Sequence, residues 1–301
     1  VEFVKSILNS KFRNELEKEF GILLFQQLEI STKIFNPSII NLLQEENKLN
    51  SEYMKLKGSA KILFDGKEYT LSSMSPFTTG KDRTVRKNAT LAVSKWFKDN
   101  ENSFDEIYDK VVKVRHEIAL KLGYENFIQL GYDRMQRVDY NHNDVKKYRE
   151  QILADVVPYV KELHERKAKR LKMDDLLSYD LNLSFLSGNP TPKGDKNFQV
   201  EQAIKMYDEM SPETSKFFRF LVDSELLDLE SKPGKNSGGY CTYIPKYQAP
   251  FIFANFNGTQ GDVDVLTHEA GHAFQVYSSR HLLPSQRWPG YEGAEIHSMS
   301  M

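Results

Sequence analysis

The stretch THEAGHAFQVY, residues Thr267–Tyr277, decides the prediction of the fold because it contains the pattern H-E-x-x-H, at His268, Glu269 and His272. Four residues advance a helix by roughly 400°, so the two imidazole rings lie about 40° apart on one helix face. Two ring nitrogens placed in this way can bind the same tetrahedral Zn²⁺ ion. Glu269 points aside from them and can accept a proton from a zinc-bound water. The stretch therefore predicts a helix that binds zinc and carries a general base.

The same pattern also has a purely structural interpretation, in which a buried helix contains two incidental histidines and a solvated glutamate. At average residue usage the pattern arises by chance in about one chain of this length per hundred. The sequence therefore favours a metalloprotease over an all-helical interaction scaffold.

Composition places the chain among globular proteins. Its 301 residues can form one large or two ordinary domains, and 40% of them are hydrophobic while 28% are charged. The 41 basic and 42 acidic residues almost cancel. We therefore expect neither a nucleic acid nor a membrane surface as a partner.

The cysteine content bears on the cellular compartment. Cys241 is the single cysteine, so an intramolecular disulfide is excluded, and a reducing, cytoplasmic location is expected. No apolar run approaches the roughly 20 residues needed to cross a bilayer, and no signal peptide is visible.

Apolar residues at helical spacing predict a mainly α fold. We expect an N-terminal helical domain over residues 1–101 and a catalytic domain over residues 102–301. The first domain should contain a short hairpin whose turn is Asp65-Gly66, a pair typical of primed turns. A long helix is expected from Asn143 to Met173, interrupted at Pro158.

A small β element should precede the zinc-binding helix. Residues Pro250–Phe256 resemble a strand, and Pro250 at its start suggests an edge or terminal position in the sheet. An edge strand could add an extended substrate peptide through backbone hydrogen bonds. Asp262 is expected to be the N-cap of the helix that follows. Gly271, inside that helix, suggests a close backbone approach beside the metal.

A catalytic zinc ion needs a third protein ligand. Pro289-Gly290 separates the zinc-binding helix from a second helix that begins near Glu292. The downstream candidates are His281, Glu292, Glu295 and His297. We expect His281 to be a surface or packing residue, but spacing alone does not choose among the other three.

Several stretches together carry a resemblance to a known family. They are HEAGHAFQVY, GAEIHSMSM, DGKEYTLSSM, DRTVRKNA, YDRMQRVDY, GKNSGGYC and FANFNGT. The chain resembles the oligoendopeptidase F branch of the thimet oligopeptidase (M3) family of zinc metallopeptidases. The resemblance implies a multi-helical, zincin-like fold with an active site deep in a channel. It also implies that Glu295 is the third zinc ligand. Glu292 is then its neighbour or a first-turn charge, and His297 either supports a ligand or lies on the substrate side.

Similar proteins continue with a further helical region after the metal motif, whereas this chain stops six residues after Glu295. The resemblance thus implies a truncated catalytic domain with weakened zinc binding and little activity of its own. The function expected for the whole protein is zinc-dependent hydrolysis of short oligopeptides. The alternative is a non-catalytic zinc- or peptide-binding protein that has retained the motif. The oligomeric state does not follow from the sequence.

Overall fold

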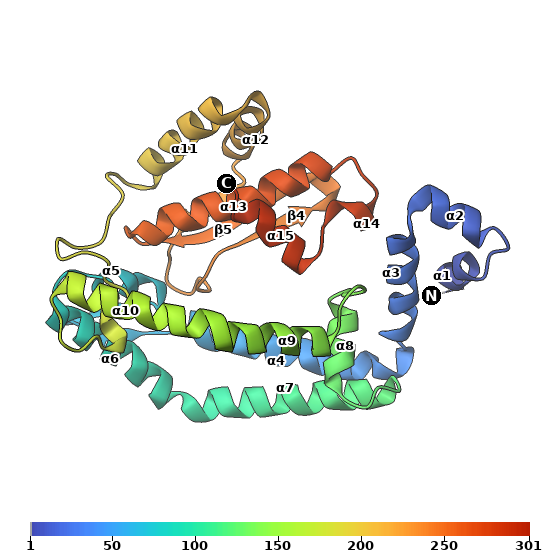
Figure 1. Ribbon diagram of the computed structural model, residues 1–301, viewed down its shortest axis with the longest axis horizontal. Helices are drawn as coiled ribbons and strands as arrows, with labels where there is room; N and C mark the ends of the chain where they lie inside the picture. The colour runs from blue at the N-terminus through green and yellow to red at the C-terminus, as the bar shows by residue number, and fades with distance from the viewer. Residues whose placement is uncertain (1) are drawn as a thin grey trace. The chain divides into compact units, whose positions relative to one another are not determined.

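The structure, a computed structural model, describes residues 2–301 as a mainly helical chain with two small sheets (Figure 1). It contains two compact units, one formed by residues up to Tyr53 together with 102–160 and the other by 54–101 together with 161–301. One crossing between the units, after Glu101, coincides with the domain boundary expected from the sequence. The division into two consecutive domains stays a prediction. None of the described helices is both long enough and apolar enough to cross a bilayer.

The first unit is entirely helical. Its elements are α1 (Glu2–Leu8), α2 (Arg13–Phe20), α3 (Ile22–Lys33), η1 (Pro37–Ile39), most of α4 (Ile40–Gly58), α7 (Glu101–Lys121), α8 (Phe127–Arg134), α9 (His142–Gln151), η3 (Ile152–Val156) and the first turn of α10 (Val157–Leu171). Ile39, Ile118 and Leu130 are fully buried and form its core.

The long helix predicted over residues 143–173 is distorted but not broken. A π-helical turn, Ile152–Val156, connects α9 and α10, and Pro158 lies just after it. Proline has no N–H, and its ring crowds the carbonyl group four residues earlier. A π turn widens the helix at that point and relieves the clash. The predicted interruption is therefore a local widening one turn before the proline.

The second unit begins with the predicted hairpin. Strands β1 (Ile62–Phe64) and β2 (Lys67–Tyr69) pair antiparallel. Asp65 and Gly66 have φ angles of 48° and 74°, as a primed turn requires. The hairpin is followed by η2 (Ser72–Met74), α5 (Ser75–Thr78) and α6 (Arg83–Asp99).

Buried ion pairs join α6 to a distant segment of the same unit. The short helix η4 (Ser178–Asp180) presents Asp180, whose side chain is 0% exposed and lies 2.7 Å from both Arg83 and Arg86. Arg86, also fully buried, donates further bonds to the carbonyl groups of Gly80 and Lys81. Its Nε donates to the carbonyl oxygen of Tyr179, so each of the three guanidinium nitrogens has an oxygen partner, which explains how the core accommodates this cation.

The remaining elements of this unit are the predicted zinc helix, α13, and the helices and strands around it. They are α11 (Lys196–Met210), α12 (Pro212–Asp223), β3 (Leu227–Glu230), β4 (Tyr240–Ile244), η5 (Pro245–Tyr247), β5 (Ala249–Phe256), α13 (Gln260–Ser279), α14 (Pro284–Arg287) and α15 (Tyr291–Ser298). Helix α13 lies along β5, and α15 packs against α13 (Figure 1). The main core of the second unit contains Phe217 of α12, Ile252 of β5 and Ala270 of α13, all fully buried.

Of the two positions expected for Pro250, the edge strand is wrong, whereas a place near the start of the strand is right, since Pro250 is the second residue of β5. β5 is the central strand, parallel to β3 on one side and antiparallel to β4 on the other. The N–H of Ile252 donates to Leu226, and the nitrogen of Pro250 faces the same side because backbone direction repeats every two residues. Pairing with β3 begins only at Ile252. The missing N–H of Pro250 therefore removes no hydrogen bond between β5 and β3. The outer edges of this sheet belong to β3 and β4, and not to the strand expected to bind a peptide.

The prediction that Asp262 caps α13 is also wrong. The helix begins at Gln260, its N-cap is Thr259, and no side chain caps it. Asp262, in the first turn, instead accepts the N–H groups of Asn257 and Gly258 at 2.9 and 2.8 Å. Its carboxylate, 3% exposed, therefore fixes the loop that leads into the helix.

Candidate metal centre

Helix α13 presents the two histidines of the motif side by side. The ring centroids of His268 and His272 lie 4.9 Å apart, as the four-residue spacing predicts. His272 is 9% exposed, and burial lowers the pKa of its imidazole. A low pKa keeps the ring neutral, which is the form that binds metal ions.

Helix α15 brings Glu295 to these histidines. Its Oε2 lies 3.4 Å from Nε2 of His268 and 3.7 Å from Nε2 of His272. Ligand atoms of the three residues all lie within 4.8 Å of one another. Two atoms bound to one tetrahedral zinc ion at about 2.0–2.1 Å would be roughly 3.3 Å apart. The donor types and their separations therefore fit a zinc ion.

The other downstream candidates lie outside this cluster. Among the described residues, His268, His272 and Glu295 form the one group of side chains placed to hold a metal ion, and Glu292, His297 and His281 do not belong to it. Glu292 and His297 are exposed residues of α15, and His281 follows α13. The choice of ligands remains a prediction, which metal analysis can test.

Gly271 allows the two helices to approach each other. A Cβ atom at this position would lie 2.6 Å from the carbonyl oxygen of His297 and 2.7 Å from Cα of Ser298. Real Cβ atoms essentially never come so close to backbone atoms. The close approach expected at Gly271 is therefore present, and it brings α15 near enough for Glu295 to reach the histidines.

Glu269 lies on the side of α13 that faces β4, close enough to His268 and Glu295 for its charge to interact with both. It is 7% exposed, and burial raises the pKa of its carboxyl group. The N–H of Cys241 in β4 donates a hydrogen bond to it. A Cβ on Gly239 would lie 3.4 Å from its Oε1. Glycine at position 239 thus keeps space open beside a buried carboxylate whose affinity for protons is raised.

Cys241 is not suited to catalysis itself. Burial raises the pKa of its thiol to about 12, so the reactive thiolate form is scarce at neutral pH.

Two asparagines hold the loops beside the centre. Asn255 donates to the carbonyl oxygens of Asn236 and Gly238, both at 2.8 Å, which fixes the loop before β4. Asn257 donates to the carbonyl oxygen of Ser72, after the hairpin. Sequence reasoning treated these stretches as family motifs only, because the bonds join residues far apart in the chain.

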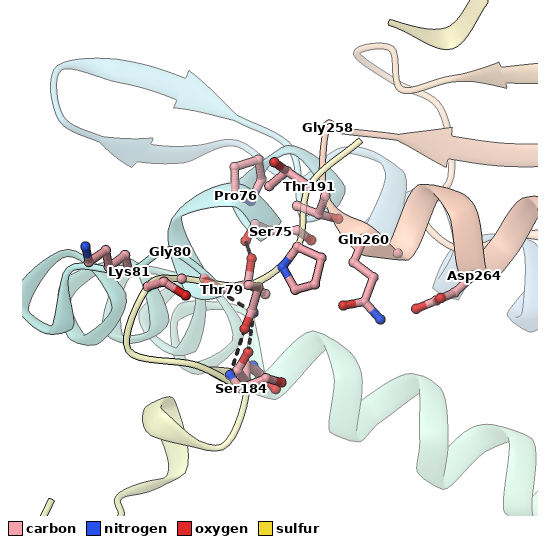
Figure 2. Close-up of a pocket in the computed structure, with 17 residues that line it drawn as sticks. Ser75, Pro76, Thr79, Gly80, Lys81, Ser184, Thr191, Gly258, Gln260 and Asp264 are labelled. Atoms are coloured by element: carbon pink, nitrogen blue, oxygen red, sulfur yellow. Dashed lines mark hydrogen bonds between the residues drawn. The ribbon is translucent and has the colours of Figure 1, made fainter. Parts of the chain in front are cut away.

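A polar cavity of about 620 Å³ adjoins the start of α13 (Figure 2). Ser75 and Thr79 line one side of it, and Gln260 and Asp264 line the other. In the view of Figure 2 the ammonium group of Lys81 points away from the interior. Gln260, Asp264 and His268 recur every four residues, so one face of α13 connects the cavity with the ligand cluster.

A mainly helical fold that carries H-E-x-x-H on a helix beside a small sheet is typical of metallopeptidases. Comparison with known proteins is more specific, since the model of peptidase family M3 matches residues 77–301. The chain belongs to peptidase family M3.

Relatives within this family include proteins called oligoendopeptidase F. A homolog from Borreliella burgdorferi is 24% identical over 79% of this chain and 42% of its own length. A structure of a putative oligoendopeptidase F from Bacillus anthracis aligns with a TM-score of 0.95 at 51% identity, over 99% of this chain and 55% of the other. The structure of PZ peptidase A with an inhibitor aligns with a TM-score of 0.97 at 52% identity, over 99% and 53%. The chain thus spans about half the length of these relatives.

Proposed function

We propose that the protein containing this chain is a zinc-dependent endopeptidase that hydrolyses peptide bonds in short oligopeptides. The observation that supports this most directly is the cluster of three ligand atoms within 4.8 Å, next to a buried glutamate. Membership of peptidase family M3 supports the same reaction.

In this proposal His268, His272 and Glu295 hold the zinc ion, which acts as a Lewis acid on the scissile carbonyl group and lowers the pKa of water. Glu269 is the general base. It accepts a proton from the attacking water and passes it to the nitrogen of the leaving amine. Its raised pKa makes it a stronger base than an exposed glutamate.

We place the substrate backbone along β4. This strand pairs with β5 on one side, and no strand of residues 2–301 pairs with its outer edge. An extended peptide can add to such an edge through backbone hydrogen bonds. β4 also follows Gly239, which lies beside Glu269, so a peptide on this edge would pass close to the general base.

The polar cavity of Figure 2 suits a more distant part of the same substrate. Gln260 and His268 are eight residues apart on one helix, which corresponds to about 12 Å. An extended peptide covers that distance with roughly four residues. Substrates of several residues would therefore reach both the ligand cluster and the cavity.

The alternative is a protein that binds zinc or peptides without cleaving them. Glu269 argues against it, because a binding protein has no use for a buried general base. The decisive experiment measures cleavage of a quenched fluorescent peptide library by the intact protein and by Glu269→Gln. We expect the variant to retain zinc and lose about 10²–10⁴-fold in rate. Zinc and peptide binding without cleavage by the unmodified protein would establish the alternative.

We also propose that the protein works in a reducing compartment such as the cytoplasm, because its sequence contains a single cysteine and so no disulfide within the chain.

A further inference from the structure

Ser298 has a buried hydroxyl group beside the predicted third ligand. The residue is 4% exposed, and its Oγ donates to Oε2 of Glu295 at 2.6 Å. Glu295 lies three residues earlier on α15, a spacing that places both side chains on one helix face. The length of the bond is that of a hydroxyl group donating to a charged carboxylate.

The hydroxyl group acts on the oxygen that faces the histidines. Oε2 of Glu295 is the atom that lies 3.4 Å from His268 and 3.7 Å from His272. The Glu295 side chain is 55% exposed, so little packing holds it in this orientation. A bond from a rigid donor to Oε2 selects the rotamer that points at the histidines.

Ser298 is itself rigidly placed. Its Cα lies against Gly271 of α13, where a Cβ atom would approach to 2.7 Å. The donor is therefore packed closely against the helix that carries the two histidines. Glu295 is the flexible member of the group, and Ser298 connects it to the rigid ones.

We propose that Ser298 is a positioning residue, which orients the Glu295 carboxylate so that it completes the metal site. This proposal rests on the proposed zinc site. Outer-shell partners of metal ligands typically contribute 10- to 100-fold to metal affinity. We therefore expect Ser298→Ala and Ser298→Gly to weaken zinc binding by about that factor, since neither residue has a hydroxyl group to donate.

The first experiment measures zinc affinity of the intact protein by competition with a chromogenic chelator. Ser300→Ala is the matched control, because Ser300 is exposed, lies at the same end of α15 and donates to the carbonyl oxygen of Ile296. We expect the affinity of the control to equal that of the unmodified protein. Unchanged affinity in both Ser298 variants would overturn the proposal, whereas absence of zinc binding by the unmodified protein would refute the proposed metal site itself.

A second experiment separates positioning from a general effect on the fold. Ser298→Ala is combined with Glu295→Ala, and affinities are compared in a double-mutant cycle. If Ser298 acts through Glu295, removing it in the Glu295→Ala background has no further effect. The visible spectrum of the cobalt-substituted protein should also change in Ser298→Ala, because it reports ligand geometry directly. An equal loss of affinity in both backgrounds, or an unchanged cobalt spectrum, would contradict the proposal.

Discussion

Gly271 of α13 lies directly against the carbonyl oxygen of His297 in α15, where an added Cβ would approach to 2.6 Å. The proposed metal ligands come from these two helices, so this contact determines the distance between them.

Gly271→Ala is expected to push α15 away from α13. Overpacking of this kind costs about 1–3 kcal/mol of stability. It should also weaken zinc binding, because Glu295 moves with α15. Thermal unfolding and chelator competition measure the two effects. Gly261→Ala, in the same helix, is the control, since the nearest atom to its added Cβ is the side-chain oxygen of Thr259 at 3.4 Å. Equal behaviour of the two variants would refute the role given to Gly271.

Replacement of the carboxylates of α15 tests the choice of ligand. Glu295→Ala is expected to reduce zinc affinity sharply, since it removes one of three protein ligands. Glu292→Ala should leave affinity unchanged, because Glu292 lies outside the cluster. Zinc content after dialysis against a weak chelator distinguishes the variants. Retention of zinc by Glu295→Ala and its loss from Glu292→Ala would reverse the assignment.

Gly239→Ala should impair turnover without affecting the metal. Its Cβ would occupy space 3.4 Å from Oε1 of Glu269 and 2.9 Å from a methyl group of Val265. A displacement of about 1 Å at a catalytic group can cost on the order of 10²-fold in rate. We expect a 10- to 100-fold lower kcat with unchanged zinc content. Peptide cleavage and metal analysis of the same preparation provide the test, and normal turnover would show that the space beside Glu269 is not needed.

Asp180→Asn should destabilise the second unit in a pH-dependent manner. Removing one partner of a buried ion pair costs about 3–5 kcal/mol, because Arg86 is then left without its counter-charge. Burial opposes ionisation of Asp180, but the bonds from Arg83 and Arg86 prevail and lower its pKa. A lowered pKa gives stability that is present above the unfolded value, about 3.9, and is lost as pH falls through the folded value.

The difference between unmodified protein and Asp180→Asn is therefore largest at neutral pH and shrinks in acid. Urea unfolding at several pH values measures it. Asp208→Asn is a suitable control, since Asp208 pairs with Arg219 at the surface and exposed pairs contribute little. A difference that grew as the pH fell would contradict the assignment to Asp180.

Local patterns in the sequence were sufficient for the helix spacing of His268 and His272 and for the turn at Asp65-Gly66, because both depend on adjacent residues. The prediction that Glu295 is the third ligand came from the family resemblance. This residue is separated from His272 by 22 intervening residues, and spacing did not distinguish it from Glu292. The errors at Pro250 and Asp262 have one cause. Both residues were interpreted from their neighbours in the sequence. Their roles depend instead on which distant segments lie beside them in the fold.

Ser298 and Gly239 were missed for related reasons. The three-residue spacing between Glu295 and Ser298 was visible, but whether the hydroxyl group faces the carboxylate depends on the packing of α15. The closeness of Gly239 to Glu269 joins a strand and a helix, and no local pattern indicates it.

The contact at Gly271 has an evolutionary consequence. On the α15 side it involves only the carbonyl oxygen of His297 and Cα of Ser298, atoms that every amino acid possesses. Selection on this contact therefore acts on one partner alone, so position 271 is restricted to glycine while the side chain at position 297 can vary. Mutation at position 297 can therefore alter the chemical surroundings of the proposed metal centre while the distance between the two helices is inherited unchanged.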